Sequence, residues 1–305
     1  MTKKYLFLSH DYRGIPIDSA IDVLRETASI DVAVLSRRQA RHLRWTLWRL
    51  KAHQYNATLI DLPFKHLHYQ GPSLQKLPNP IVYDEDAYQD RIPHRKWFGK
   101  FSSFYKQFHR IKVLNTGYQT MGHFRRQGID SAFAPKGHDE RILYPEGLEY
   151  RDIEVGFVGR LRSNVYRERA ELINAATNRL SCQVMRTHTP DEYRNTLNRI
   201  RFFFSADRGL GEYMAKNFEA MSCGCVLVAW RQGEGEEDFL GLVDGQNCVL
   251  YSSIDEAEKK IHELKKDHSK FRHIQEQGTK LAKNRFSHTR LGQTLRDTLK
   301  GGALK

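Results

Sequence analysis

The sequence predicts an α/β protein made of two domains, each with a parallel sheet. Three observations lead to this prediction. The chain has 305 residues, close to twice the usual domain length of ~150 residues. Strand-like apolar runs alternate with helical stretches along the chain, which is typical of parallel α/β folds. The alternation restarts after residues 133–147, a segment with the prolines and glycines of an interdomain connection.

The first half carries the signals of one such domain. Short runs of large apolar residues predict strands at Tyr5–Ser9, Ile30–Leu35, Ala57–Ile60, Ile81–Tyr83 and Ile111–Asn115. Between the first two strands, the spacing of apolar residues predicts a helix over Asp18–Ala28. We expect this domain to span residues 1–137.

The second half repeats the pattern with different residues. Strands are predicted at Ile153–Val158, Cys182–Arg186, Ile200–Ser205, Cys225–Ala229 and Val249–Tyr251, and helices at Arg167–Arg179 and Asp191–Asn198. From Ile254 onward the chain is helical, with a break at Phe286–His288. We expect a second domain over residues 138–287 and a last helix, residues 288–305, that crosses back to the first domain.

Composition excludes several classes of protein. Hydrophobic residues make up 40% of the chain and aromatic residues 11%, which is incompatible with a disordered chain. No apolar run approaches the ~18 residues of a membrane span, and the apolar stretch near the start is too short for a signal peptide. The four cysteines are expected to be reduced thiols of a cytoplasmic protein. Cys223 and Cys225 lack a second pair for a zinc site, so no metal is expected there.

The charge balance is strongly basic. Lysine and arginine total 49 against 36 aspartate and glutamate, a formal net charge of +13. Such an excess favours an anionic partner: nucleic acid, a phosphorylated substrate or an anionic membrane surface. A merely solubilising surface is the alternative.

Residues 202–230 are the most informative stretch. A buried strand runs into a glycine-containing loop, a helix begins near Ala215 and ends at Gly224, and the next strand follows at once. Free N–H groups at such a helix start suit a phosphate or a sugar hydroxyl, and the Glu219 carboxylate can bind a ribose diol. An ordinary βαβ unit with a capped helix is the alternative interpretation.

The same stretch resembles a known family. Residues 217–226, NFEAMSCGCV, are similar to the EAMACGxPV signature of GT-B glycosyltransferases of the "glycosyl transferases group 1" type, including its CgeB-like branch. Residues 133–145, 155–160 and 238–251 resemble further segments of that family, in the same order. The resemblance extends over roughly residues 111–290. It implies the GT-B fold, in which two Rossmann-like domains enclose the active site in the cleft between them.

The resemblance also implies donor-binding residues. Glu219 matches the second glutamate of an E-x7-E pair, which binds the nucleotide ribose, whereas the first glutamate contacts the sugar. Gly211 stands at that first position, and Glu212 is the nearest carboxylate. The sugar would therefore contact either Glu212 or backbone amides of the glycine loop.

Basic residues would neutralise the donor diphosphate by bidentate, charge-assisted hydrogen bonds. Arg160, which follows Gly159 in a segment similar to the FVGR loop of the family, is the first choice. Other residues expected at the donor site are Arg162 or Arg167, Lys216 and Asn217.

The first half offers acceptor-site candidates. His10 follows the first strand, at the edge of the sheet where ligands bind in open α/β folds; a structural histidine is the alternative. Asp84, Glu85 and Asp86 follow a later strand and could orient an acceptor hydroxyl; a solvated loop is the alternative. Their D-x-D pattern chelates a metal in the unrelated GT-A fold, a role that we do not expect here.

Residues 36–53 supply much of the positive charge. On a helical wheel their alanine and leucines share one face, which can pack on the sheet, and the arginines occupy the other with two tryptophans. A basic face with tryptophans suits a membrane interface or an anionic glycolipid; a solvated helix is the alternative. The residues proposed for this surface are Arg37, Arg38, Arg41, Arg44, Trp45 and Trp48.

Together these features predict a glycosyltransferase that moves a sugar from a UDP- or GDP-linked donor to a hydroxyl of a glycan or glycolipid. The resemblance implies retention of configuration, and charged residues replace a metal. We expect no cofactor, no nucleic-acid partner, a role in cell-surface polysaccharide or lipopolysaccharide biosynthesis, and a cytoplasmic location that includes the inner membrane face. The alternatives are a nucleotide-sugar epimerase of the same fold and a non-catalytic protein that binds nucleotide sugars or nucleic acid.

Overall fold

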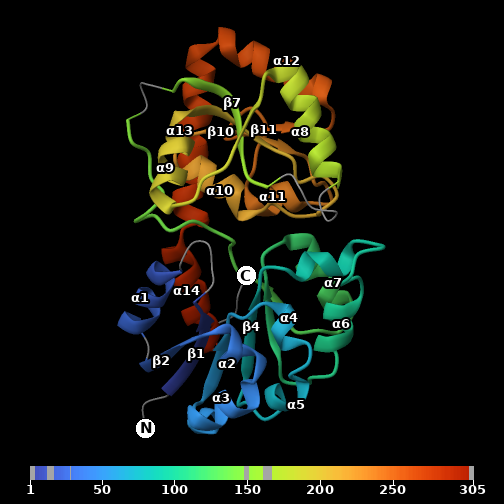
Figure 1. Ribbon diagram of the computed structural model, residues 1–305, viewed down its shortest axis with the longest axis vertical. Helices are drawn as coiled ribbons and strands as arrows, with labels where there is room; N and C mark the ends of the chain where they lie inside the picture. The colour runs from blue at the N-terminus through green and yellow to red at the C-terminus, as the bar shows by residue number, and fades with distance from the viewer. Residues whose placement is uncertain (1–3, 12–16, 28, 148–150, 161–166, 302–305) are drawn as a thin grey trace. The chain divides into compact units, whose positions relative to one another are not determined.

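The computed structural model describes residues 4–11, 17–27, 29–147, 151–160 and 167–301 (Figure 1). It divides into two compact units, one made of residues 1–135 and 288–305 and the other of residues 136–287. The chain therefore leaves the first unit once and returns to it for a helix. Among the described residues, no helix is both long and apolar enough to span a bilayer.

The first unit contains a parallel sheet in the order β2-β1-β3-β4-β5-β6. Its strands are β1 (Lys4–His10), β2 (Ser29–Leu35), β3 (Ala57–Ile60), β4 (Pro80–Asp84), β5 (Lys112–Asn115) and β6 (Ser131–Phe133). Strand β2 lies on one side of β1. The strands that follow, β3 to β6, are added one after another on the other side. The order thus reverses between β1 and β3, and open α/β sheets bind ligands at the carboxyl ends of strands at such a reversal.

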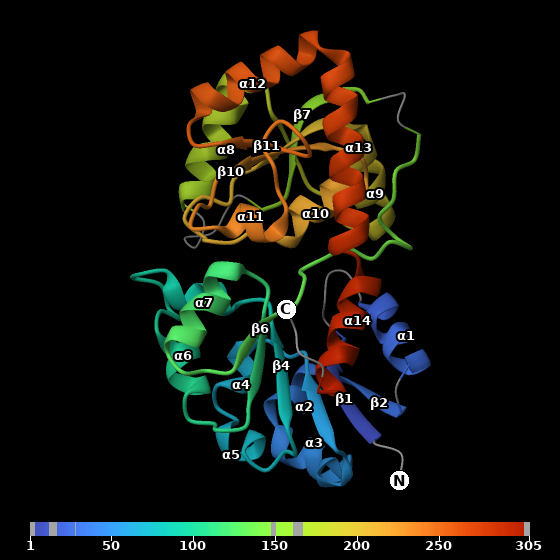
Figure 2. The same ribbon diagram turned by 180° about the vertical axis from the view of Figure 1, so that it is seen from behind.

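Helices cover both faces of this sheet (Figures 1 and 2). They are α1 (Asp18–Thr27), α2 (Arg37–Arg41), α3 (Leu43–Arg49), α4 (Phe64–Leu67), α5 (Gly71–Leu74), α6 (Lys100–Tyr105), α7 (Tyr118–Arg126) and α14 (His288–Leu299), with 3₁₀ turns at Ala52–Gln54 and Ala87–Arg91. Helix α14 packs beside α1, although the two are far apart in the sequence.

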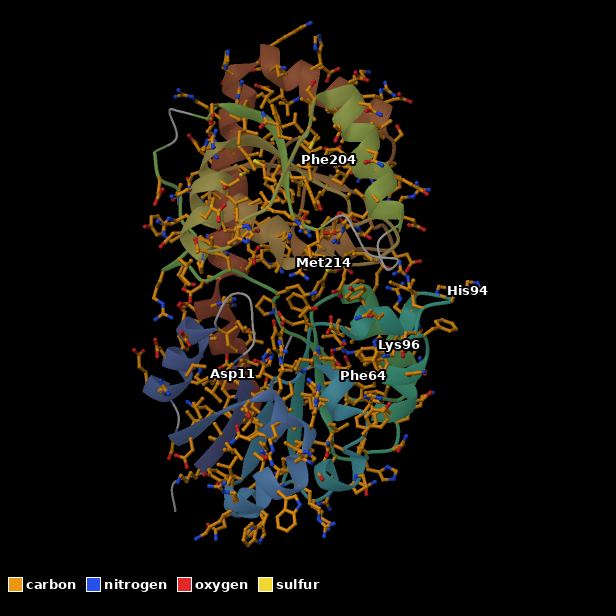
Figure 3. All side chains as sticks on the ribbon, viewed as in Figure 1. Asp11, Phe64, His94, Lys96, Phe204 and Met214 are labelled. Atoms are coloured by element: carbon orange, nitrogen blue, oxygen red, sulfur yellow. The ribbon has the colours of Figure 1, made fainter. Side chains whose placement is uncertain are left out.

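The pleat of β1 explains how two cores form. Leu6 and Leu8 belong to the core on one face, together with Phe64 (Figure 3), whereas Tyr5 and Phe7 belong to the core under α1 and α14. Successive side chains of a strand point to opposite faces, so a strand buried on both faces reads as a continuous apolar run.

The second unit contains a parallel sheet in the order β11-β10-β9-β7-β8. Its strands are β7 (Ile153–Val158), β8 (Gln183–Met185), β9 (Ile200–Ser205), β10 (Val226–Trp230) and β11 (Val249–Tyr251). Its helices are α8 (Arg167–Leu180), α9 (Pro190–Arg199), α10 (Ala215–Ser222), α11 (Glu236–Leu240), α12 (Ile254–Lys266) and α13 (His268–Arg285). Here the strand order reverses between β7 and β9. Phe204 lies in its core (Figure 3).

The prediction of one helix over residues 36–53 is wrong. Residues 36–53 do not form a single helix, because His42 leaves the helical conformation (φ −116°, ψ 51°) between α2 and α3. The Thr46 hydroxyl donates a hydrogen bond to the Gln39 carbonyl oxygen (3.0 Å), which stabilises the break. The predicted apolar face is nevertheless buried at Ala40, Leu43 and Leu47.

The four cysteines are free and buried. Burial raises the pKa of the Cys225 thiol to about 11. At neutral pH this side chain is therefore a protonated thiol, and it packs as a small apolar group.

Candidate donor site in the second unit

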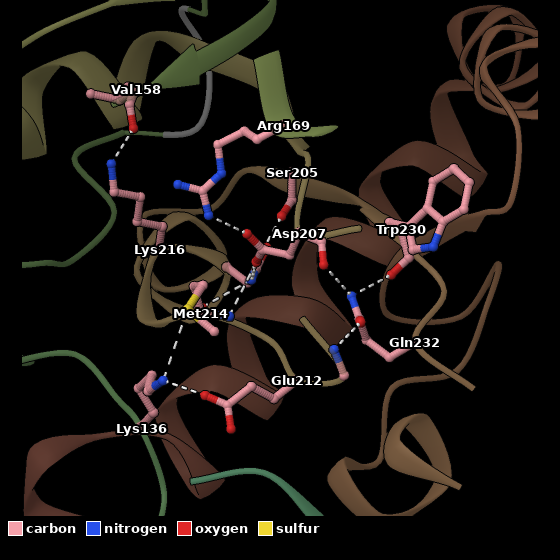
Figure 4. A network of polar contacts seen from close by, with 12 residues as sticks. Lys136, Val158, Arg169, Ser205, Asp207, Glu212, Met214, Lys216, Trp230 and Gln232 are labelled. Carbon is pink, nitrogen blue, oxygen red and sulfur yellow. Dashed lines mark hydrogen bonds and ion pairs between the residues drawn. The ribbon is translucent and has the colours of Figure 1, made fainter. Parts of the chain in front are cut away.

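Polar side chains gather where β7, β9 and β10 end (Figure 4). Asp207, two residues after β9, is the centre of this network. Its Oδ1 accepts a hydrogen bond from Arg169 Nη2 of α8 (2.9 Å), and its Oδ2 accepts from Asn217 Nδ2 of α10 (2.7 Å) and from the Met214 backbone N–H (3.1 Å). Asp207 therefore fixes the start of α10 against the end of β9, the strand next to the reversal.

Lys216 brings a positive charge to the end of β7. Its Nζ donates a hydrogen bond to the Val158 carbonyl oxygen (2.6 Å). Burial lowers the pKa of Lys216; Arg169 and Arg160 lower it further, and Glu219 and Asp207 partly oppose this effect. A Cβ atom at residue 159 would lie 2.5 Å from this Nζ, so Gly159 leaves the space that the ammonium group occupies.

Glu219 lies one turn along the same helix and is buried. Its Oε2 accepts a hydrogen bond from the Tyr193 hydroxyl of α9 (2.6 Å). Burial and the adjacent carboxylate raise the pKa of Tyr193 far above its usual value, so this hydroxyl stays protonated and remains a donor. The interaction fixes the orientation of the carboxylate.

Glu212 forms a buried ion pair. Its Oε1 lies 2.6 Å from Lys136 Nζ, and both residues are almost completely inaccessible to solvent. Glu212, the carboxylate next to the E-x7-E position that Gly211 occupies, is thus neutralised by Lys136. This lysine belongs to the segment that enters the second unit.

Gln232, two residues after β10, holds the glycine loop. Its Oε1 accepts a hydrogen bond from the Gly211 backbone N–H (2.9 Å), and its Nε2 donates to the Asp207 carbonyl oxygen (3.1 Å). Gly211 has a positive φ of 68°, which glycine adopts without strain. Its amide is therefore engaged within the protein.

The remaining predicted donor residues are placed as follows. Arg160 is exposed directly after Gly159. Arg162 lies outside the described residues, and so does the side chain of Arg167. Asn217 is fully buried, and its Nδ2 also donates to the Met214 carbonyl oxygen (2.9 Å).

Four residues of this network were missed by sequence reasoning: Lys136, Arg169, Asp207 and Gln232. Asp207 follows the predicted strand Ile200–Ser205 by two residues and Gln232 follows the predicted strand Cys225–Ala229 by three, positions that could have marked them as candidates. Arg169 and Lys136 carry no comparable signal, because only the folded chain brings them next to Asp207 and Glu212.

The first-unit candidates lie in separate places. His10 is the last residue of β1 and is partly buried. Asp84, the last residue of β4, is buried; its Oδ2 accepts from the Tyr105 hydroxyl (2.7 Å) and its Oδ1 from the Asp86 N–H (3.0 Å). Glu85 accepts from the Tyr83 hydroxyl (3.2 Å). Within the described ranges, no group of three histidine, cysteine or acidic side chains has a metal-binding arrangement.

The six residues proposed for an anionic surface are all exposed: Arg37, Arg38, Arg41, Arg44, Trp45 and Trp48. The indole rings of the two tryptophans meet edge to face, with centroids 6.1 Å apart. Arg37 and Arg41 additionally line a hollow of the first unit, whereas the other four do not.

Comparison with known proteins finds similarity in sequence for the second unit and in fold for the whole chain. Residues 154–297 match the family model described as glycosyl transferase-like. HepE from Anabaena, solved in complex with UDP and glucose, is similar with a TM-score of 0.70 at 15% identity, over 98% of this chain and 99% of that chain. Sucrose-phosphate synthase from Thermosynechococcus elongatus is similar with a TM-score of 0.69 at 9% identity, over the same shares. No curated protein sequence matches the chain significantly.

The chain therefore has the GT-B fold, as predicted. Most of its second unit is similar in sequence to the glycosyl transferase-like family.

Proposed function

We propose that this protein transfers a sugar from a UDP-sugar to a hydroxyl group of a glycan or glycolipid. The observation that carries the proposal is the position of three cations at the reversal of strand order in the second unit: Lys216 Nζ lies next to Gly159, which Arg160 follows, and Asp207 holds Arg169 at the end of β9. Glu219 lies on the same helix as Lys216. Three cationic groups suit a diphosphate, and a carboxylate suits the ribose. UDP is preferred over GDP because HepE, which shares the fold, was solved with UDP.

The proposed reaction breaks the bond between the sugar C1 and the diphosphate oxygen, and forms a bond from the acceptor oxygen to C1. The acceptor hydroxyl loses its proton, and negative charge grows on the departing diphosphate. Lys216 and Arg160 stabilise that charge electrostatically in a preorganised site. We propose that the sugar retains its anomeric configuration and that the acceptor belongs to a cell-surface polysaccharide or lipopolysaccharide.

Glu219→Ala should weaken UDP binding at least tenfold. A charged partner contributes about 1.5–3 kcal/mol per hydrogen bond, and the carboxylate is assigned to the two ribose hydroxyls. Isothermal titration calorimetry with UDP measures the loss. Tyr193→Phe is the matched control, since it removes the hydrogen bond to Glu219 but keeps the carboxylate. Unchanged affinity in folded Glu219→Ala would remove this assignment.

We further propose that no divalent metal takes part, and we expect transfer to continue at its full rate in excess chelator. The measurement is UDP release in the presence of acceptor, with and without the chelator. Loss of activity that manganese restores would contradict the proposal and would return Asp84, Glu85 and Asp86 to consideration as a metal site.

The exposed arginines and tryptophans lead to a proposal about location, namely the inner face of the cytoplasmic membrane. Each basic residue at an anionic surface contributes about 1 kcal/mol. The protein should co-sediment with phosphatidylglycerol vesicles, and not with neutral vesicles, at low salt. Replacing Arg37, Arg38, Arg41 and Arg44 with glutamine should abolish this binding. If the wild-type protein ignores anionic vesicles, these residues form only a solvated surface.

A further inference from the structure

The first unit contains a basic hollow at the reversal of its strand order. The hollow has a volume of about 500 Å³, within the range of small-molecule sites. Two short segments supply its walls: α2, which follows β2, and α4 with the residues after it, which follow β3. Both segments leave the carboxyl ends of strands that flank β1. The lining residues are Arg37, Arg41, Lys65, His66, Tyr69 and Gln70.

The charge of this hollow has one sign. Arg37, Arg41 and Lys65 are cationic, and none of the described residues that line it carries a carboxylate. His66 is buried, and its pKa is lowered first by burial and then by Lys65, Arg41, His10 and Arg37. These basic groups therefore lie close enough to repel a further positive charge, and His66 is a neutral hydrogen-bonding group at pH 7.

The two walls are tied together and also present an aromatic ring. Gln70 Nε2 donates a hydrogen bond to the Arg41 carbonyl oxygen (2.6 Å), which links α4 and the residues after it to α2. Tyr69 is 80% exposed, although its ring lies against His68. An exposed ring beside cationic groups can pack against the apolar face of a sugar whose charged substituent the cations hold.

We propose that this hollow binds a phosphate group on the acceptor, so that the acceptor is a phosphorylated saccharide. Three cationic groups match the double charge of a phosphate monoester better than the single charge of a carboxylate, and the planar guanidinium of arginine binds phosphate oxygens in pairs. Tyr69 is assigned to the adjoining sugar ring. The inference rests on the proposed glycosyltransferase function and names its acceptor class.

Calorimetry on UDP-saturated protein at low salt tests this proposal, because UDP fills the donor site and keeps other phosphates out of it. The titrants are glucose 6-phosphate, mannose 6-phosphate, glucose, inorganic phosphate and short-chain phosphatidic acid below its micelle concentration. We expect a hexose phosphate to bind at least tenfold more tightly than glucose and more tightly than inorganic phosphate. Binding of the lipid phosphate without any hexose phosphate would overturn the saccharide assignment.

Two double variants with the same change in charge make the test specific. Arg37→Gln/Arg41→Gln removes two cations that line the hollow and should weaken binding of the hexose phosphate at least tenfold. Lys76→Gln/Lys106→Gln removes two exposed cations of the same unit that do not line the hollow and should change binding less than twofold. Equal losses in both variants, or no phosphate binding while UDP still binds, would overturn the proposal. Failure of UDP itself to bind would instead contradict the proposed donor site, so the two failures are distinguishable.

Discussion

Lys216→Met is expected to lower kcat by about 10²–10³-fold, the size of effect seen when one preorganised donor to a developing anion is removed. The side chain is partly buried, and its Nζ lies at the end of β7, 2.6 Å from the Val158 carbonyl oxygen. Methionine keeps most of its volume and removes a charge whose burial is costly, so the fold should be retained. A single-turnover assay with a UDP-sugar measures the effect on the chemical step.

The pH dependence gives this prediction a second readout. Lys216 supplies positive charge below its pKa and loses it as the pH rises through that value. Because burial, Arg169 and Arg160 lower this pKa, activity should begin to fall at a lower pH than an exposed lysine would allow. The alkaline decline should disappear in Lys216→Met.

Lys260→Met is the control for the loss of a lysine in the same unit, because its ammonium group is already paired with Asp244 and Glu256. Its kcat should stay near that of the wild type. If Lys216→Met behaved like this control, another group would have to carry the leaving-group charge.

Lys136→Met is expected to lower the free energy of unfolding of the second unit by about 3–5 kcal/mol, the usual cost of removing one partner from a buried ion pair. The ammonium group lies 2.6 Å from Glu212 Oε1, and the carboxylate is fully buried. Removing the ammonium group leaves the Glu212 carboxylate charged, without its lysine, in a medium of low dielectric. Urea unfolding, followed by circular dichroism, measures the change.

Glu212→Gln in the Lys136→Met background is the matched control, since it removes the carboxylate charge as well. The double variant should recover most of the lost stability. The single variant Glu212→Gln also tests the role of this residue at the donor sugar. If Glu212 contacts the sugar, kcat/KM should fall in a protein that stays folded; if the pair is structural, stability alone should change. Equal stability of Lys136→Met and wild type would contradict a strong ion pair.

Much of the fold could be predicted because buried parallel strands have a simple sequence pattern. The runs Ile153–Val158 and Ile200–Ser205 are strands β7 and β9 with the predicted bounds. Apart from its second residue, each strand is buried on both faces of the sheet, and its apolar run stands out from the helices around it. The short helices α4 and α5 were not predicted, because four residues cannot show a helical period.

The donor site was only partly predictable. Glu219 and Lys216 share one helix, so a local motif could point to both. Arg169 and Gln232 reach Asp207 from segments on either side in the sequence, and only the strand order brings them together. The single helix predicted for residues 36–53 failed for a related reason. Its apolar spacing was right, but a hydrogen bond from the Thr46 side chain to a backbone carbonyl favours the break at His42.

The position of α14 affects the order in which the protein can fold during its synthesis. Leu291, Leu295 and Leu299 share a buried cluster with Tyr5 and Phe7 of β1, yet they leave the ribosome after the whole second unit. The second unit is one continuous segment, so it can complete its core first. Until then the first unit carries an uncovered apolar face beside α1. We therefore expect the first unit to complete its core after the second, the reverse of the usual order in which the N-terminal domain folds first, with an apolar surface exposed on the nascent chain until α14 emerges.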